Sequence, residues 1–135
     1  MMYRTLIAAV ALASAGLVGW ALLPATAQQA AVQRKVLMTQ DLPIPGYQSA
    51  MVSVELPVGS REGRHTHPGA GFAYILEGSI TLEHEGRPTT TYKAGDTIYI
   101  EANKVHEGIN PGSVPVKLVA TFVFEKGKPL ASPAP

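Results

Sequence analysis

Short stretches in which apolar and polar residues alternate make up most of the chain after residue 47. Over residues 48–56, every second residue is Ala, Val or Leu, and the residues between them are mostly polar. Because successive side chains of a strand point to opposite faces, this alternation predicts a half-buried strand. Strands are also predicted at 72–76, 79–84, 89–92, 97–100 and 116–124, with turn residues between them. The last is apolar at nearly every position, which is typical of a strand buried on both faces. No helical periodicity follows residue 27, so the chain is predicted to be all-β, a sandwich or a barrel.

The first 27 residues have the order of an export signal. Arg4 supplies a positive charge, residues 5–23 carry no charge, and Ala25-Thr26-Ala27 is a small-residue cleavage site. The sequence therefore predicts a secretory signal peptide at 1–27, cleaved after Ala27, and a periplasmic or secreted protein. The alternative is an uncleaved membrane anchor. A bilayer-spanning helix needs about 18 apolar residues, and the uncharged run at 5–23 is long enough to supply them.

Length and charge limit what the remainder can be. The chain has 135 residues, with 11 basic and 10 acidic side chains, so it holds one domain and no basic stripe that would bind nucleic acid. It contains no cysteine, so its core must hold the fold without disulfides. We divide it into an N-terminal lead-in at 28–47 with a short edge strand at 36–38, a β-barrel domain at 48–125, and a proline-rich tail at 126–135 that is expected to be loosely ordered.

Three of the four histidines form a pattern. His65 and His67 are separated by one residue, so on a strand they project from the same face, and His106 would come from a strand across the barrel. Neutral imidazoles suit a divalent metal ion such as Fe, Ni, Cu, Zn or, less well, Mn. The alternative is that each is a polar residue at a strand end. The fourth histidine, His84, precedes the predicted hairpin at Glu85-Gly86 and is expected to be solvated.

The spacing of these residues resembles that of the cupins, a family of small jelly-roll β-barrels. The resemblance covers about residues 52–124 and implies a double-sheet barrel with a metal site formed by the three histidines. Glu101 and Asn103 stand where the second family motif has proline and glycine. The matching residues are Gly59, His65, His67 and Gly78 in the first motif, and Gly95, His106 and Asn110 in the second.

Gly71 is the departure with the greatest consequence, because it stands where the family motif has a glutamate ligand. A divalent ion with three neutral ligands would keep its charge and an open position for water, an anion, dioxygen or substrate. The loss of the carboxylate would equally weaken metal binding. Glu62, Glu101 and Glu107 are candidate replacements, although Glu107 should point away from the strand face used by His106.

A ligand pocket is predicted beside the metal. If Gly71 faces inward, alternation places Ala73 and Ile75 on the same wall. Tyr74 and Tyr99 are weaker pocket candidates, because aromatic residues in strands more often belong to the core. Arg61 and Arg64 flank the loop before the histidines, where they would attract an anionic substrate or simply form a solvated loop face.

Three functions remain open from these residues. The first is a metal-dependent dioxygenase or related oxidoreductase that acts on a small organic molecule. The second is a cupin that binds a metal or a small ligand without turnover. The third is a structural domain without metal. A small-molecule ligand is the expected partner in the first two, nucleic acid is not expected, and a homodimer is compatible with the nearly neutral charge.

Overall fold

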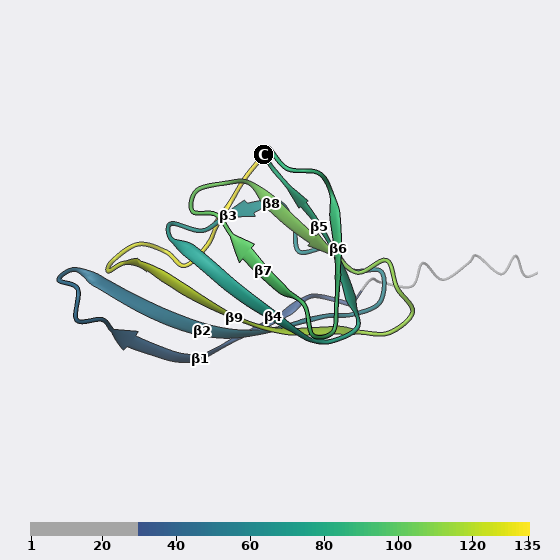
Figure 1. Ribbon diagram of the computed structural model, residues 1–135, viewed down its shortest axis with the longest axis horizontal. Coiled ribbons are helices and arrows are strands. Elements are labelled where there is room, and N and C mark those ends of the chain that lie inside the picture. The colour runs from purple at the N-terminus through teal and green to yellow at the C-terminus, as the bar shows by residue number, and fades with distance from the viewer. Residues whose placement is uncertain (1–29) are drawn as a thin grey trace, which may run out of the picture.

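The computed structural model describes residues 30–135, which form two five-stranded antiparallel sheets and no helix. Figure 1 shows a long, gently curved sheet facing a shorter one. The larger sheet has the order β1 (Gln33–Asp41), β2 (Tyr47–Leu56), β9 (Val116–Glu125), β4 (Ala70–Glu77), β7 (Thr97–Ile100). The smaller sheet has the order β10 (Ser132–Pro133), β3 (His65–Thr66), β8 (His106–Ile109), β5 (Ser79–His84), β6 (Thr90–Lys93).

The alternation seen in the sequence sets which face of each strand is buried. In β2 and β9 every second residue is buried, and the two strands pair over their whole length. The prediction that 116–124 is buried on both faces is wrong, because the residues on the outer face of β9 are only half-buried. Their inner faces meet those of β4, β5 and β7 between the sheets, where Leu56, Ile75, Ile80 and Val116 are the largest fully buried apolar side chains. The prediction of an all-β jelly-roll barrel made of two sheets is therefore confirmed.

The two ends of the described chain differ from their predictions. The lead-in contains a strand of nine residues, β1, rather than a short one at 36–38, and the pairing of β1 with β2 shifts register between Val36 and Met38. The tail is not loosely appended. It forms β10, which pairs with β3, and Leu130 packs against the core. Alternation could not reveal this, because the tail pairs through two residues only.

The predicted signal peptide at 1–27 lies outside the described residues. Across residues 30–135, the structure has no helix that is long and apolar enough to cross a membrane.

Candidate metal centre

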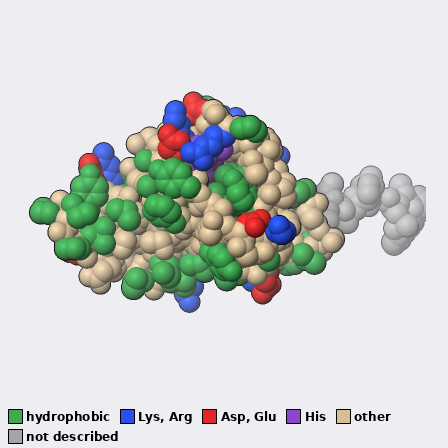
Figure 2. Space-filling view, in the orientation of Figure 1, with side chains coloured by type: hydrophobic (Ala, Val, Ile, Leu, Met, Phe, Trp, Pro, Cys, Tyr) green, Lys and Arg blue, Asp and Glu red, His purple; other side chains and the backbone are tan. Residues whose placement is uncertain are grey.

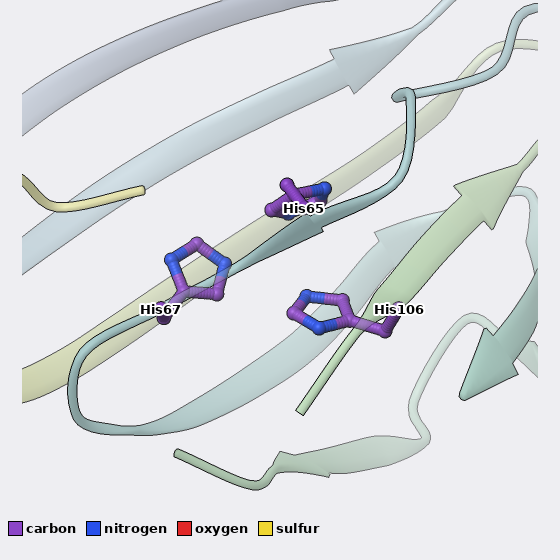
Figure 3. Close-up of side chains that lie close together, drawn as sticks. All are labelled: His65, His67 and His106. Carbon is purple, nitrogen blue, oxygen red and sulfur yellow. The ribbon is translucent and has the colours of Figure 1, made fainter. Parts of the chain in front are cut away.

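The structure brings the three histidines of the sequence pattern together at one end of the barrel. His65 lies in β3 and His106 begins β8, and the two residues are directly opposite each other in the pairing of these strands. His67 follows β3 in the turn toward β4. One ring nitrogen of each residue lies within 4.8 Å of those of the other two. Figure 3 shows the three rings grouped around a common point.

The other ring nitrogen of each histidine is engaged by the backbone. Nδ1 lies 2.7 Å from the carbonyl oxygen of Gly63 in His65, 2.8 Å from that of Leu130 in His67, and 3.0 Å from that of Lys104 in His106. A carbonyl oxygen only accepts, so each Nδ1 carries the proton and donates it. Each Nε2 is then left as a lone-pair donor to a metal. Three grouped acceptors cannot satisfy one another, so these residues fit a metal cation.

Burial keeps two of these imidazoles neutral. Desolvation lowers the pKa of His67 to about 4, against the opposing effect of its hydrogen bond to the Leu130 carbonyl. Desolvation likewise lowers the pKa of His106 to about 4, again opposed by its bond to a backbone carbonyl. Both rings are therefore unprotonated at neutral pH, which is the form that binds metal.

Phe122 occupies the space where the family glutamate would project. Gly71 in β4 lies opposite Phe122 in β9, and a Cβ on Gly71 would overlap the Phe122 ring. The same ring packs against His67, with centroids 4.0 Å apart. The missing side chain has thus been replaced by an aromatic wall. The Phe122 ring makes this side of the histidine cluster apolar, so any further ligand to a metal must come from another direction.

The three candidate replacement glutamates have different surroundings. Glu107 accepts from Arg61 Nε and Nη2 at 3.1 and 2.6 Å, and this hydrogen bond lowers its pKa. It does not line the cavity beside the histidines, in agreement with the prediction that it points away from the face used by His106. Glu101 pairs with Arg87 at 3.0 Å, with both side chains partly exposed. Only Glu62 lines the same cavity as the histidines, and it is not one of the grouped ligands.

The prediction that His84 is a solvated hairpin tip is wrong. β5 continues through His84, and alternation turns its ring inward after Ile80 and Leu82. The ring lies opposite His106 in the strand pairing and stacks on it at 5.8 Å between centroids. Nδ1 lies 3.0 Å from the Glu85 carbonyl oxygen, and the buried Nε2 has no hydrogen-bond partner among the described residues. The His84 ring therefore packs against the ring of the predicted metal ligand His106.

A cavity of about 450 Å³ opens beside the histidines and reaches between the sheets. Of the predicted wall, Ala73 lines it, whereas Ile75 is fully buried in the core and the Phe122 ring covers Gly71. The prediction that Tyr74 and Tyr99 line it is wrong. They alternate with the inward residues of β4 and β7, so they lie half exposed on the outer face.

The lining residues that were not singled out in the sequence include Arg34, Phe122, Leu130 and Pro133. Continuing the alternation along 116–124 would have placed Phe122 inward. No comparable pattern identifies the other three, because they reach the cavity only through the way β1 and the C-terminal segment fold back.

Comparison with known proteins supports the fold. The Cupin domain pattern matches residues 52–122, more than half of the chain. An uncharacterized protein of Methanocaldococcus jannaschii is 36% identical over 77 residues, which are 55% of this chain and 59% of that protein. The chain therefore spans less than two thirds of this relative.

Solved structures show the same fold at low sequence identity. An uncharacterized double-stranded β-helix protein from Klebsiella pneumoniae superposes with a TM-score of 0.64 at 20% identity, over 83% of this chain and 89% of that one. The DMSP lyase DddQ of Ruegeria pomeroyi gives 0.58 at 20% identity, over 64% and 43%. A recombinant oxalate oxidase in complex with glycolate gives 0.56 at 19%, over 63% and 45%. From its matched sequence pattern and its double-sheet barrel, this chain belongs to the cupin domain family.

Proposed function

We propose that this protein is a metal-dependent enzyme that binds one divalent cation through His65, His67 and His106 and acts on a small organic molecule. The observation that carries this proposal is the set of three bonds from Nδ1 to backbone carbonyls, which leaves each Nε2 lone pair available in a cluster whose ligand atoms lie within 4.8 Å of one another. A divalent ion in a site of this kind supplies Lewis acidity and, when the metal is redox-active, electron transfer.

The residues around the histidines favour a reaction that needs exclusion of water. The cavity walls are mainly aliphatic, and Phe122 covers one side of the cluster. In such surroundings, charges on a substrate interact strongly with nearby groups. Among the described residues, Glu62 is the one carboxylate that lines the cavity, so it is positioned to accept a proton from a bound molecule.

An oxidoreductase of the dioxygenase type is the first candidate reaction. Its support is the donor set, because three neutral imidazoles without a carboxylate leave positions for both dioxygen and substrate. The barrel is shared with proteins described as an oxalate oxidase and a DMSP lyase, so a lyase reaction is compatible with the same scaffold. Neither likeness extends beyond the fold.

The second candidate is a cupin that binds ligand without turnover. The replacement of the family carboxylate by the pair Gly71 and Phe122 favours this candidate. A metal ion bound only by neutral ligands is held less tightly than one that also has a carboxylate ligand.

Elemental analysis of protein purified from its own exported compartment tests the metal site. We expect close to one metal ion per chain, and we expect His106→Ala to lose it. Tyr74→Ala is the matched control, since this side chain lies on the outer face. Full-length wild-type protein without metal, and without stabilisation by added Fe²⁺, Mn²⁺, Ni²⁺, Cu²⁺ or Zn²⁺, would contradict the proposal. Oxygen uptake with a substrate panel then separates the enzyme from the binding protein.

We also propose that residues 1–27 direct export and are removed after Ala27. Cell fractionation and mass measurement of the mature chain test this, with a mature N-terminus at Gln28 as the expected result. A chain retained in the membrane with its first residues intact would favour the anchor.

A further inference from the structure

The cavity beside the histidines has an apolar interior and a charged end. Figure 2 shows histidine exposed next to Lys or Arg side chains at this end of the molecule. The charged lining residues are Arg34, Glu62 and Arg64. The apolar walls come from both sheets: Val52, Val54, Ala73, Ile80, Leu82, Ile98, Ile100, Leu118, Ala120 and Phe122. A ligand that matches both parts has a polar head and an apolar body.

Arg34 is directed at the cavity by the register of β1. It lies opposite Val54, a cavity wall residue, whereas its neighbour Lys35 lies opposite Ser53. Side chains of directly opposed residues share one face of a sheet. The guanidinium of Arg34 is also close enough to His67 for its charge to lower the pKa of that ring. Arg34 therefore places a positive charge at the histidine end of the cavity.

Glu62 fixes this arginine and has its own charge largely matched. Its Oε2 accepts from the backbone N–H of Gly108 at 3.1 Å, and its Oε1 lies 3.6 Å from Arg34 Nη2. Arg34 Nη2 also donates to the Glu62 carbonyl at 3.2 Å. A Cβ at position 108 would lie 2.5 Å from Oε2, so the glycine makes room for this carboxylate. One Nη2 is used in these contacts, which leaves other guanidinium N–H groups for a ligand.

The balance of charge at this end is positive. Arg34 and Glu62 offset each other, Arg64 adds a positive charge that is shared with Glu107, and the histidines add none when neutral. A bound divalent cation makes the balance more positive. We propose that the ligand of this site is a monocarboxylate with an apolar body. This inference rests on the proposed function, which identifies the site as a metal centre. Its carboxylate lies beside the histidines and Arg34, and its hydrocarbon lies between the sheets.

Three probes with the same chain test this: octanoate, 1-octanol and octylamine, titrated calorimetrically into Zn²⁺-loaded and metal-free protein. We expect octanoate to bind at least about tenfold more tightly than octanol, as is typical of charge-assisted hydrogen bonds. Octylamine should bind no better than octanol. Arg34→Gln should remove about tenfold from octanoate binding in both forms and leave octanol unchanged. Lys35→Gln is the matched control, because it removes the same charge from the other face of β1.

The possible results separate this inference from the metal proposal. Equal binding of octanoate and octanol, tighter binding of octylamine, or an equal effect of Arg34→Gln and Lys35→Gln would overturn the carboxylate site. Each can be observed while Zn²⁺ still binds stoichiometrically. Conversely, a protein that fails to bind Zn²⁺ but retains Arg34-dependent octanoate binding refutes the metal site and supports the carboxylate site. Circular dichroism of both variants checks that the sheets are intact.

Discussion

The two segments that flank the matched cupin region contribute to the site in inverse relation to the length of the strands that they form. β1 is nine residues long and pairs with β2 over most of its length, yet every residue in it is exposed. The C-terminal segment 126–135 forms a strand of only two residues, yet Leu130 is partly buried and its carbonyl oxygen accepts from His67. The extent of strand pairing is therefore a poor measure of what a segment does for the histidines.

The reason is where each segment runs. β1 lies at the edge of the larger sheet, so both of its faces are exposed to solvent. Arg34 is the one residue of β1 that lines the cavity. The C-terminal segment crosses the mouth of the barrel, pairs with β3 at His65 and Thr66, and donates from Ala134 N–H to the Arg64 carbonyl at 3.0 Å. It therefore contacts the histidines through a few backbone atoms, of which the Leu130 carbonyl oxygen is the one bonded to a histidine ring.

The largest effect is expected at the centre of the larger sheet, which gives the scale for both edges. Gly71→Glu forces a side chain into the Phe122 ring, and we expect a loss of about 3 kcal/mol in the free energy of unfolding from overpacking and burial of a carboxyl group. Urea unfolding of the metal-free protein measures it.

The double variant Gly71→Glu/Phe122→Ala sharpens this test. Removing the ring should recover part of the stability lost in Gly71→Glu, although Phe122→Ala alone opens a cavity and is itself destabilising. The carboxylate then has room beside His67, and we expect tighter metal binding than in the wild type. Additive losses in the double variant would show that the Phe122 ring does not occupy the glutamate position.

The next effect concerns the C-terminal segment. A chain that ends at Lys128 lacks the Leu130 carbonyl and β10, so we expect metal affinity to fall about 10- to 100-fold, as for loss of a partner that orients a metal ligand. Competition with a chromophoric Zn²⁺ chelator measures this.

Two controls separate the carbonyl from the rest of the segment. A chain that ends at Pro133 retains the carbonyl and should bind metal like the full chain. Leu130→Ala also keeps the carbonyl and should have a smaller effect than truncation. Unchanged affinity in the chain that ends at Lys128 would mean that β3 and β8 alone hold His67.

Much of the fold and the identity of the three histidines could be predicted, because both depend on local patterns. Alternation of side chains identified β2 and β5, apolar runs identified β4 and β9, and the spacing of His65, His67 and His106 allowed the three rings to be grouped. The surroundings of the histidines could not be predicted in the same way. Phe122 and the Leu130 carbonyl lie 55 and 63 residues after His67 along the chain. Only the folded chain shows that both contact the His67 ring.

Tyr74 and Tyr99 show how the same pattern can be misapplied. Their residue type suited a pocket wall, but alternation with Ala73 and with Ile98 and Ile100 had already assigned them to the outer face. His84 is the reverse case, since its position in the alternation of β5 placed it inside while its closeness to a hairpin indicated solvent. Where residue type and side-chain period disagreed, the period was correct.

An intermediate effect is expected from pH, and it compares the two edges directly. The folded pKa of His67 and His106, about 4, lies below the value of 6.5 expected when unfolded. Between these values the unfolded chain binds more protons, so the stability of the metal-free protein is full above about pH 6.5 and falls as pH drops toward 4. Urea unfolding across this range measures it.

The C-terminal segment should influence this pH dependence, and the exposed apolar residues of β1 should not. A chain that ends at Lys128 exposes His67, so its stability should fall less steeply with decreasing pH, whereas Val36→Ser in β1 should leave the slope unchanged. Equal slopes in the full and the shortened chain would contradict burial of His67 by the segment.

The smallest effect is expected from the apolar residues of β1. Val36, Leu37 and Met38 are each about half exposed, so changing all three to Ser should cost about 1 kcal/mol or less and leave metal affinity unchanged. Urea unfolding, chelator competition and light scattering on the same samples measure stability, affinity and mass. A loss well above this, together with a fall from dimer to monomer, would show that a second copy covers β1, as the predicted homodimer allows. The long edge would then be as buried in the assembly as the short one is in the single chain, and the contrast between the two segments would hold only for an isolated subunit.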